Sequence, residues 1–200
     1  MVKNNLRKSL LKQGLALSNT FIESSSKTIQ LKFIDYLHDQ KVKSILLYSP
    51  FRQEIKLDLI FKSMKDGLVD IYLPKVLPNK KLKFNLYTRN TNLVKNRYGI
   101  LESVSKKFIN INDIQLLVIP FLGVDKKGAR LGYGSGYYDR AIGERYESKH
   151  EPNIIGLGYE YQLTESSFGE SHDMRYNKVI TESNIHSCLL YTSDAADEED

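Results

Sequence analysis

Residues 125–140 read D-K-K-G-A-R-L-G-Y-G-S-G-Y-Y-D-R, and the interpretation of the whole chain starts from this stretch. Gly132, Gly134 and Gly136 occupy every second position in it. A glycine has no Cβ, so the backbone at these sites can adopt a positive φ and lie directly against a ligand. Successive backbone N–H groups in such a loop can converge on an anion. The pattern therefore predicts an anion-binding loop.

The flanks of this loop predict a strand before it and a helix after it. The apolar run Leu116–Ile119 is typical of a buried strand, and Pro120 would end it. Tyr138, Ile142 and Tyr146 have helical spacing, which predicts a helix from Tyr137 whose first N–H groups point into the loop. Strand, basic glycine-rich loop and helix together indicate a phosphate site. The G-K-[ST] ending of a P-loop is absent, so the pattern alone leaves open a tight turn packed by tyrosines.

The segment Arg130–Asp139, R-L-G-Y-G-S-G-Y-Y-D, resembles the signature R-L-G-x-G-x-G-Y-Y-D of the 5-formyltetrahydrofolate cyclo-ligases, also called methenyltetrahydrofolate synthetases. The resemblance extends along nearly the whole chain. It implies ATP- and Mg²⁺-dependent cyclisation of 5-formyltetrahydrofolate to 5,10-methenyltetrahydrofolate, with release of ADP and phosphate.

Composition indicates an ordinary globular protein. Two hundred residues with 41% hydrophobic and 26% charged residues favour one α/β domain over residues 1–187. No apolar run approaches the roughly 20 residues of a membrane span, and no signal peptide opens the chain. The single cysteine, Cys188, excludes an internal disulfide. We expect a cytoplasmic monomer with no membrane partner.

The charge distribution favours an anionic partner. The net charge is +5, and five acids fall within the last seven residues, so without them the net positive charge would double. A basic body fits nucleotides or a polyanionic cofactor, although scattered lysines also fit a solvated surface.

Other segments predict helices interleaved with short strands. The spacing predicts helices over residues 3–17, from a cap at Ser26, and around Leu57 to a stop at Gly67. Apolar runs predict strands at 45–48, at 69–75 ended by its proline, and at 154–159; residues 82–86 alternate as an exposed edge strand would. The order predicts a three-layer α/β/α fold with a mainly parallel central sheet.

Lys3 and Arg7 lie four residues apart, so both side chains would project from one side of the first helix. From spacing alone this is a solvated basic face. The family's opening K-x-x-x-R implies that both residues help hold ATP. The resemblance implies the following ATP-binding set: Lys3, Arg7, Arg130, Leu131, Gly132, Tyr133, Gly134, Ser135, Gly136, Tyr137 and Tyr138.

Glu54 follows a predicted strand, at the end where open α/β sheets bind ligands, although an acid there also suits a helix N-terminus. The resemblance implies that Glu54 and Ser49 contact the folate. Tyr133 and Tyr137 could stack on the pterin or adenine ring, or pack in the core.

The expected catalytic residues are Arg130, Tyr133 and Asp139. Of these, Arg130 offers a planar guanidinium that can bind phosphate oxygens with two hydrogen bonds. Asp139 and Asp173 are the expected Mg²⁺ ligands, since Mg²⁺ takes one or two carboxylates with waters and phosphates. The alternative roles are structural: Asp139 would be an acid in the first turn of a helix, and Asp173 would be an acid in a turn.

Three positions depart from the family pattern. Ser103 replaces a proline, which predicts a looser turn, whereas Phe121 and Val124 replace glycine and phenylalanine, which predicts a different backbone or folate-facing wall. His172-Asp173 and V-I-T-E at 179–182 resemble the family's closing elements. Residues 188–200 resemble the in-frame translation of a sequencing-library adapter, and we assign them no function.

Three alternative functions remain at this stage. A different small-molecule kinase or NTPase could use the same loop. A basic module with 13 tyrosines could bind single-stranded RNA by stacking, but no RNA-binding motif is present. A degenerate folate binder is disfavoured because every charged site residue is present. We expect 5-formyltetrahydrofolate, with or without a polyglutamate tail, and ATP as partners, and no nucleic acid.

Overall fold

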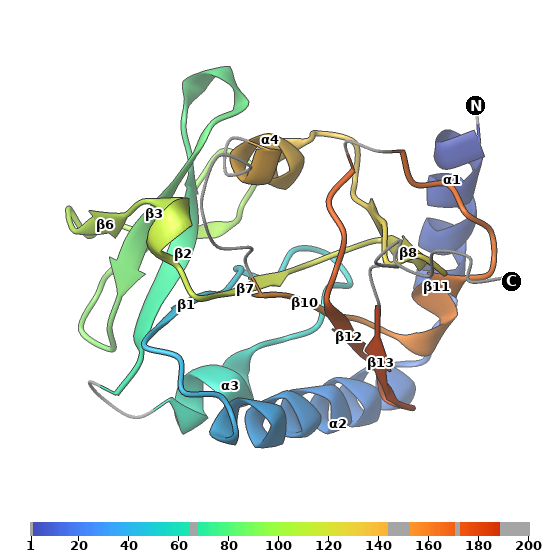
Figure 1. The fold of residues 1–200 in the computed structure, drawn as a ribbon, viewed down its shortest axis with the longest axis horizontal. Coiled ribbons are helices and arrows are strands. Elements are labelled where there is room, and N and C mark those ends of the chain that lie inside the picture. Colours follow the sequence, from blue (N-terminus) through green and yellow to red (C-terminus); the bar gives the residue numbers. More distant parts are fainter. Residues whose placement is uncertain (1, 65–67, 144–152, 171–172, 189–200) are drawn as a thin grey trace, which may run out of the picture.

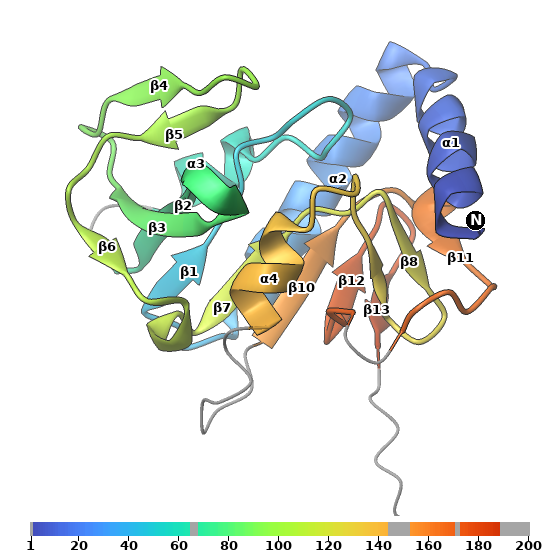
Figure 2. The ribbon, with the colours of Figure 1, turned by 90° about the horizontal axis from the view of Figure 1, so that it is seen from above.

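The computed structural model describes residues 2–64, 68–143, 153–170 and 173–188. One large sheet runs through the middle of the molecule, with helices on both faces (Figures 1 and 2). This confirms the three-layer α/β/α prediction. The predictions for Gly67, Tyr146, His172 and residues 189–200 lie outside the described residues. Within the described part of the chain, no helix combines the length and apolarity that crossing a bilayer requires.

The helices are short except for the second. Their bounds are α1 (Val2–Leu15), α2 (Asn19–His38), α3 (Asp58–Ser63) and α4 (Tyr137–Gly143), with 3₁₀ turns η1 (Pro78–Lys80), η2 (Ile111–Asp113) and η3 (Glu160–Gln162).

The main sheet has the order β13-β12-β10-β7-β1-β2-β3-β6. The five strands from β12 to β2 are mutually parallel, and antiparallel strands are added at both sides. The bounds are β1 (Ser44–Leu46), β2 (Asp70–Val76), β3 (Leu82–Tyr87), β6 (Phe108–Ile109), β7 (Leu116–Ile119), β10 (Asn153–Leu157), β12 (Lys178–Ile180) and β13 (Ile185–Ser187).

The buried strands divide their side chains between two cores. Leu116 and Val118 face the core under α2 and α3, whereas Leu117 and Ile119 face the core under α4. All four side chains have no exposed surface. Because successive residues of a strand point to opposite faces, a strand covered by helices on both sides must be apolar throughout. The continuous apolar run of β7 meets that requirement.

The chain changes direction in the sheet at β1. From β1 it proceeds to β2 on one side, then returns to β7 on the other side and continues outward to β10 and β12. The carboxyl ends of β1 and β7 therefore flank a topological switch point, where open α/β sheets bind ligands.

A second sheet carries the glycine-rich loop. It has the order β11-β8-β9, with β8 (Gly123–Asp125), β9 (Arg130–Leu131) and β11 (Leu163–Thr164). Helix α1 lies beside it in Figure 2, and Leu10 packs with Leu131 in a third core. The strand directly before the glycine-rich loop is therefore β9 and not the predicted Leu116–Ile119, because the β8–β9 hairpin intervenes.

Several local predictions were wrong. Helix α2 begins at Asn19 with Ser18 as its cap, whose Oγ accepts from the N–H of Phe21 at 3.2 Å, and Ser26 is buried inside the helix. Strand β2 continues through Pro74, because β1 already ends opposite Tyr72 and no neighbouring strand needs the missing N–H. Strand β3 is not an edge, because β6 covers it.

The three departures from the family pattern also behave differently from expectation. The Ser103 hydroxyl donates to the Leu86 carbonyl at 2.6 Å and accepts from the N–H of Ser105. This residue therefore ties strand β5 (Leu101–Ser103) to β3 instead of loosening a turn. Phe121 and Val124 are 2% and 1% exposed and belong to the core. The cavity described below is not lined by either residue.

Candidate active site

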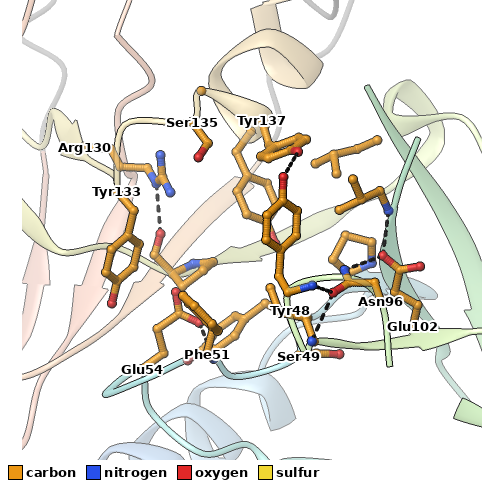
Figure 3. Close-up of a pocket in the computed structure, with 18 residues that line it drawn as sticks. Tyr48, Ser49, Phe51, Glu54, Asn96, Glu102, Arg130, Tyr133, Ser135 and Tyr137 are labelled. Carbon is orange, nitrogen blue, oxygen red and sulfur yellow. Dashed lines mark hydrogen bonds between the residues drawn. The ribbon is translucent and has the colours of Figure 1, made fainter. Parts of the chain in front are cut away.

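A cavity of about 190 Å³ lies beside the carboxyl ends of β1 and β7. Pockets that enclose a whole drug-sized ligand usually measure roughly 300–1,000 Å³, so this cavity is suited to one part of a larger substrate. Figure 3 shows the lining side chains. They are Tyr48, Ser49, Phe51, Glu54, Pro74, Val76, Leu82, Asn96, Tyr98, Ile100, Glu102, Pro120, Arg130, Tyr133, Ser135, Gly136, Tyr137 and Tyr138.

The glycine-rich loop, residues 132–136, forms one wall of this cavity. Gly134 and Gly136 have φ values of 98° and 63°, a left-handed conformation that favours glycine. Gly132 is required for a different reason, because a Cβ there would collide with the Arg130 guanidinium. The sequence therefore correctly located a loop that needs glycine, and the structure shows two separate causes.

Arg130 is a buried cation at the junction of the cavity and the loop. Its Nε donates to the Pro120 carbonyl at 2.9 Å, which fixes the guanidinium at the end of β7. One terminal nitrogen lies 3.4 Å from the nearer carboxylate oxygen of Asp139. Burial opposes the charged form, but Tyr176, Asp139, Tyr138 and Glu54 together raise the pKa of Arg130. The group therefore stays cationic.

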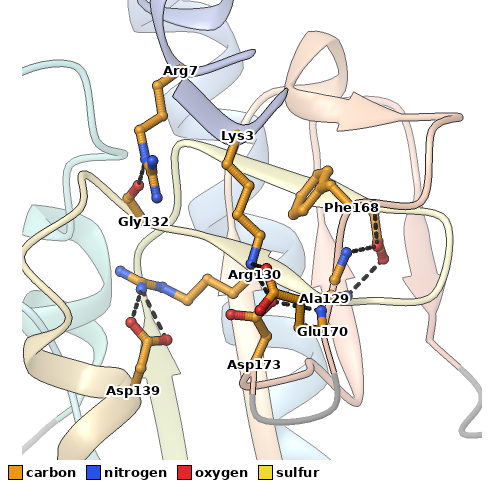
Figure 4. A network of polar contacts seen from close by, with 11 residues as sticks. Lys3, Arg7, Ala129, Arg130, Gly132, Asp139, Phe168, Glu170 and Asp173 are labelled. Carbon is orange, nitrogen blue, oxygen red and sulfur yellow. Dashed lines mark hydrogen bonds and ion pairs between the residues drawn. The ribbon is translucent and has the colours of Figure 1, made fainter. Parts of the chain in front are cut away.

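The N-terminal helix carries two more cations, one of which contacts the loop (Figure 4). Arg7 donates from Nε to the Gly132 carbonyl at 2.9 Å. Lys3 Nζ lies 2.6 Å from Asp173 and 3.0 Å from Glu170. Burial disfavours the charged amine, yet these two carboxylates raise the pKa of Lys3. Arg7 therefore contacts the loop directly, whereas Lys3 pairs with two carboxylates of another segment.

Asp139 and Asp173 each pair with a cation in this structure, Arg130 and Lys3 respectively. Among the described residues, no three His, Cys, Asp or Glu side chains gather into a metal-binding cluster. Two carboxylates on separate segments do not form a complete metal-binding site of protein ligands. They fit Mg²⁺ that arrives with phosphates, since this ion needs only one or two carboxylates beside water and phosphate oxygens.

Glu54 and Ser49 lie in the turn that follows β1. Glu54 accepts from the N–H of Phe51 at 2.8 Å through Oε2 and lines the cavity. Burial raises the pKa of Glu54 to about 7, against the opposing effects of that N–H and of Arg130. The Ser49 hydroxyl donates to the Leu101 carbonyl at 2.6 Å, which ties the turn to β5.

The predicted aromatic residues surround the cavity. Tyr133 packs edge-on against Phe51 with ring centroids 6.2 Å apart, and Tyr138 lies under the Arg130 guanidinium at 5.5 Å. The hydroxyls of Tyr137 and Tyr98 lie 3.3 Å apart. Burial raises the pKa of Tyr133 and of Tyr138, so both are neutral near pH 7.

Leu131 is the predicted ATP-binding residue whose side chain lies elsewhere. It is 1% exposed and packs on Leu10 and Leu122 in the core under α1. Only its backbone can take part in a phosphate site.

The opposite wall of the cavity, which sequence patterns did not predict, is a hairpin of β4 (Leu93–Lys95) and β5 (Leu101–Ser103). Glu102 accepts from the N–H of Val76 at 2.9 Å and from Asn96 Nδ2 at 2.7 Å through Oε1. Asn96 in turn accepts from the N–H groups of Tyr98 and Ile100. Glu102 is only 5% exposed, and this burial cannot be read from the sequence because it depends on the distant strand β2.

A switch-point cavity bordered by a glycine-rich loop, a buried arginine and tyrosines is the arrangement of an α/β protein with a small-molecule site. The sequence profile of the 5-formyltetrahydrofolate cyclo-ligase family matches residues 1–182. The chain belongs to this family and is an ATP-using ligase of folate one-carbon metabolism.

Individual relatives agree with this placement. The chain is 29% identical to the 5-formyltetrahydrofolate cyclo-ligase of Mycoplasma pneumoniae over 81% of its own length and 88% of that protein. It is 30% identical to the Haemophilus influenzae enzyme over 70% and 76% of the two chains. The solved 5,10-methenyltetrahydrofolate synthetase of Aquifex aeolicus superposes with a TM-score of 0.81 at 25% identity, covering 100% of this chain and 97% of that one. That of Mycoplasma pneumoniae gives 0.74 at 27% identity, covering 91% and 99%.

Proposed function

We propose that the cavity holds the reduced pterin of 5-formyltetrahydrofolate while the glycine-rich loop holds the ATP phosphates. One observation carries this assignment: Glu54, which follows β1, lines the same cavity as Arg130 and Gly136, which belong to the distant stretch around the glycine-rich loop. A formyl oxygen seated there would lie between the folate site and the phosphate site. Phosphoryl transfer requires this alignment above all.

The chemical difficulty is that the formyl oxygen, like an amide oxygen, is a poor leaving group. Transfer of the γ-phosphoryl group to it converts it into phosphate. N10 of the folate then attacks the formyl carbon and closes the ring, so no protein nucleophile is needed. The protein's contribution is alignment and stabilisation of spreading negative charge.

The position of each residue around the cavity determines its proposed role. Arg130, fixed by Pro120, faces the phosphoryl group, and Arg7 and Lys3 add positive charge from α1. Tyr133 and Tyr137 border the ring site, with Ser49 and Glu54 beneath it. Mg²⁺, when bound, would neutralise phosphate charge, with Asp139 and Asp173 as its protein ligands. We further infer that the chain acts as a cytoplasmic monomer on 5-formyltetrahydrofolate with or without a polyglutamate tail, and has no nucleic-acid or membrane partner.

The test is direct. Folded protein mixed with 5-formyltetrahydrofolate, ATP and MgCl₂ should produce the absorbance of the methenyl product. Failure to form it at any pH would reject the proposal, and ATP hydrolysis without the folate would favour a general NTPase instead.

A matched pair of variants tests the phosphate site. Arg7→Gln removes a cation that touches the loop, and Lys12→Gln removes an exposed one from the same helix. Because a charge-assisted hydrogen bond contributes about 1.5–3 kcal/mol, the first should raise the KM for ATP roughly tenfold or more. The second should leave it unchanged, and equal effects would mean that only net charge matters.

A further inference from the structure

Glu54 is held in a way that fixes one carboxylate oxygen and leaves the other available. Its Oε2 accepts the N–H of Phe51, and its own N–H donates to the Phe51 carbonyl at 3.2 Å, closing a tight turn. Within the described residues, Oε1 has no hydrogen-bond or ion-pair partner. In Figure 3 Glu54 lies on the same side of the cavity as Tyr133 and Arg130. The free oxygen is therefore available to a ligand near the phosphate site.

Ring closure requires a proton acceptor, and none of the roles assigned above supplies one. When the N10 lone pair forms the bond to the phosphorylated formyl carbon, N10 still carries its hydrogen and becomes positively charged. That proton must leave before the carbon–oxygen bond breaks and its electron pair departs with phosphate. The amidinium product then carries one positive charge shared by N5 and N10. The step needs a base and no oxidant or reductant.

Two carboxylates line the cavity, Glu54 and Glu102. Glu102 already accepts two donors through Oε1 and belongs to the hairpin, which Figure 3 places across the cavity from Arg130. Asp139 and Asp173 lie outside the cavity lining and pair with cations. Of the two carboxylates that line the cavity, Glu54 is the one on the Arg130 side (Figure 3).

The electrostatic surroundings of Glu54 suit a base that works near neutral pH. Tyr48, Tyr133 and Tyr138 face it, and burial together with the Glu54 charge raises the pKa of each, so all three stay neutral. Arg130 is the cation whose field reaches it. General bases are most effective when their pKa lies close to the working pH, and burial places that of Glu54 at about 7.

We propose that Glu54 is the general base that removes the N10 proton during ring closure. This rests on the proposed function and adds a catalytic role to a residue otherwise expected only to contact the folate. Phosphorylation of the formyl oxygen precedes this step and does not need it. The two steps can therefore be separated experimentally.

The experiment uses the full chain carrying Glu54→Gln, with exposed Glu23→Gln as control. ATP labelled with ¹⁸O in the β,γ-bridge reports reversible phosphoryl transfer by scrambling of the label, and absorbance reports the methenyl product. We expect Glu54→Gln to form product ~10²–10⁴-fold more slowly, the usual contribution of a general base. It should still scramble label in a folate-dependent manner, and Glu23→Gln should match the wild type.

The pH profile gives a second readout. Wild-type kcat/KM should fall about tenfold per pH unit below a pKa near 7, and the residual activity of Glu54→Gln should lack this limb. Loss of scrambling together with loss of product, or near-normal turnover, would overturn the proposal. If Glu54→Gln does not fold, Glu54→Asp should keep the acid limb with reduced kcat, and a profile without the limb would equally overturn it. Absence of product from the wild type would instead refute the proposed function.

Discussion

Replacement of Glu54 by glutamine should change the dependence of folding stability on pH by an amount that the structure sets. The pKa of Glu54 rises from 4.5 to about 7 on folding because the carboxylate is buried. The folded state therefore binds this proton more tightly than the unfolded state. Its stabilising contribution is complete below pH 4.5 and is lost as the pH rises through 7. Glutamine does not titrate, so the variant lacks this loss.

The magnitude follows from linkage. Each pKa unit corresponds to about 1.4 kcal/mol, so between pH 5 and pH 8.5 the wild type should lose about 2.5 kcal/mol relative to Glu54→Gln. Urea denaturation of both proteins at several pH values measures the difference in the free energy of unfolding. Any constant cost of burying the amide cancels, because only the change with pH is compared. A difference that stays constant across this range would refute the reasoning that Glu54 is destabilised by burial.

Three other predictions concern the loop, the metal and a departure from the family pattern. Gly132→Ala should displace the Arg130 guanidinium and lower kcat/KM for ATP. Gly143→Ala is the control, because its added Cβ meets nothing within 4 Å, and it should leave kcat/KM unchanged. The same kcat/KM in both variants would contradict the proposed clash with Arg130. Asp139→Asn should lower kcat by about 100-fold and raise the Mg²⁺ concentration needed for half-maximal activity, while circular dichroism shows an unchanged fold. If the variant needs no more Mg²⁺ than the wild type, Asp139 is not a metal ligand. Ser103→Ala should lower the free energy of unfolding by about 0.5–1.5 kcal/mol, because it removes the hydrogen bond to the partly buried Leu86 carbonyl. An unchanged denaturation midpoint would contradict this.

Local order along the chain was largely predictable because its causes are local. The apolar run of β7, the glycines at 132–136 and the four-residue spacing of Lys3 and Arg7 each express a requirement that acts over a few residues. Errors arose where a distant segment decided the outcome. Pro74 does not end β2 because the neighbouring β1 stops first, and Ser103 tightens its surroundings because β3 lies within reach of its hydroxyl.

By itself, the sequence determined the alternation of strands and helices, the family signature and the identity of the charged residues, because periodicity and motif are properties of neighbouring positions. Only the tertiary structure decided that Glu54, Arg130 and the β4–β5 hairpin enclose one cavity. It also decided that Leu131 faces a core and that Glu54 has a pKa near neutrality. Burial and electrostatic field depend on which distant segments pack together, and that packing follows from the order of strands in the sheet.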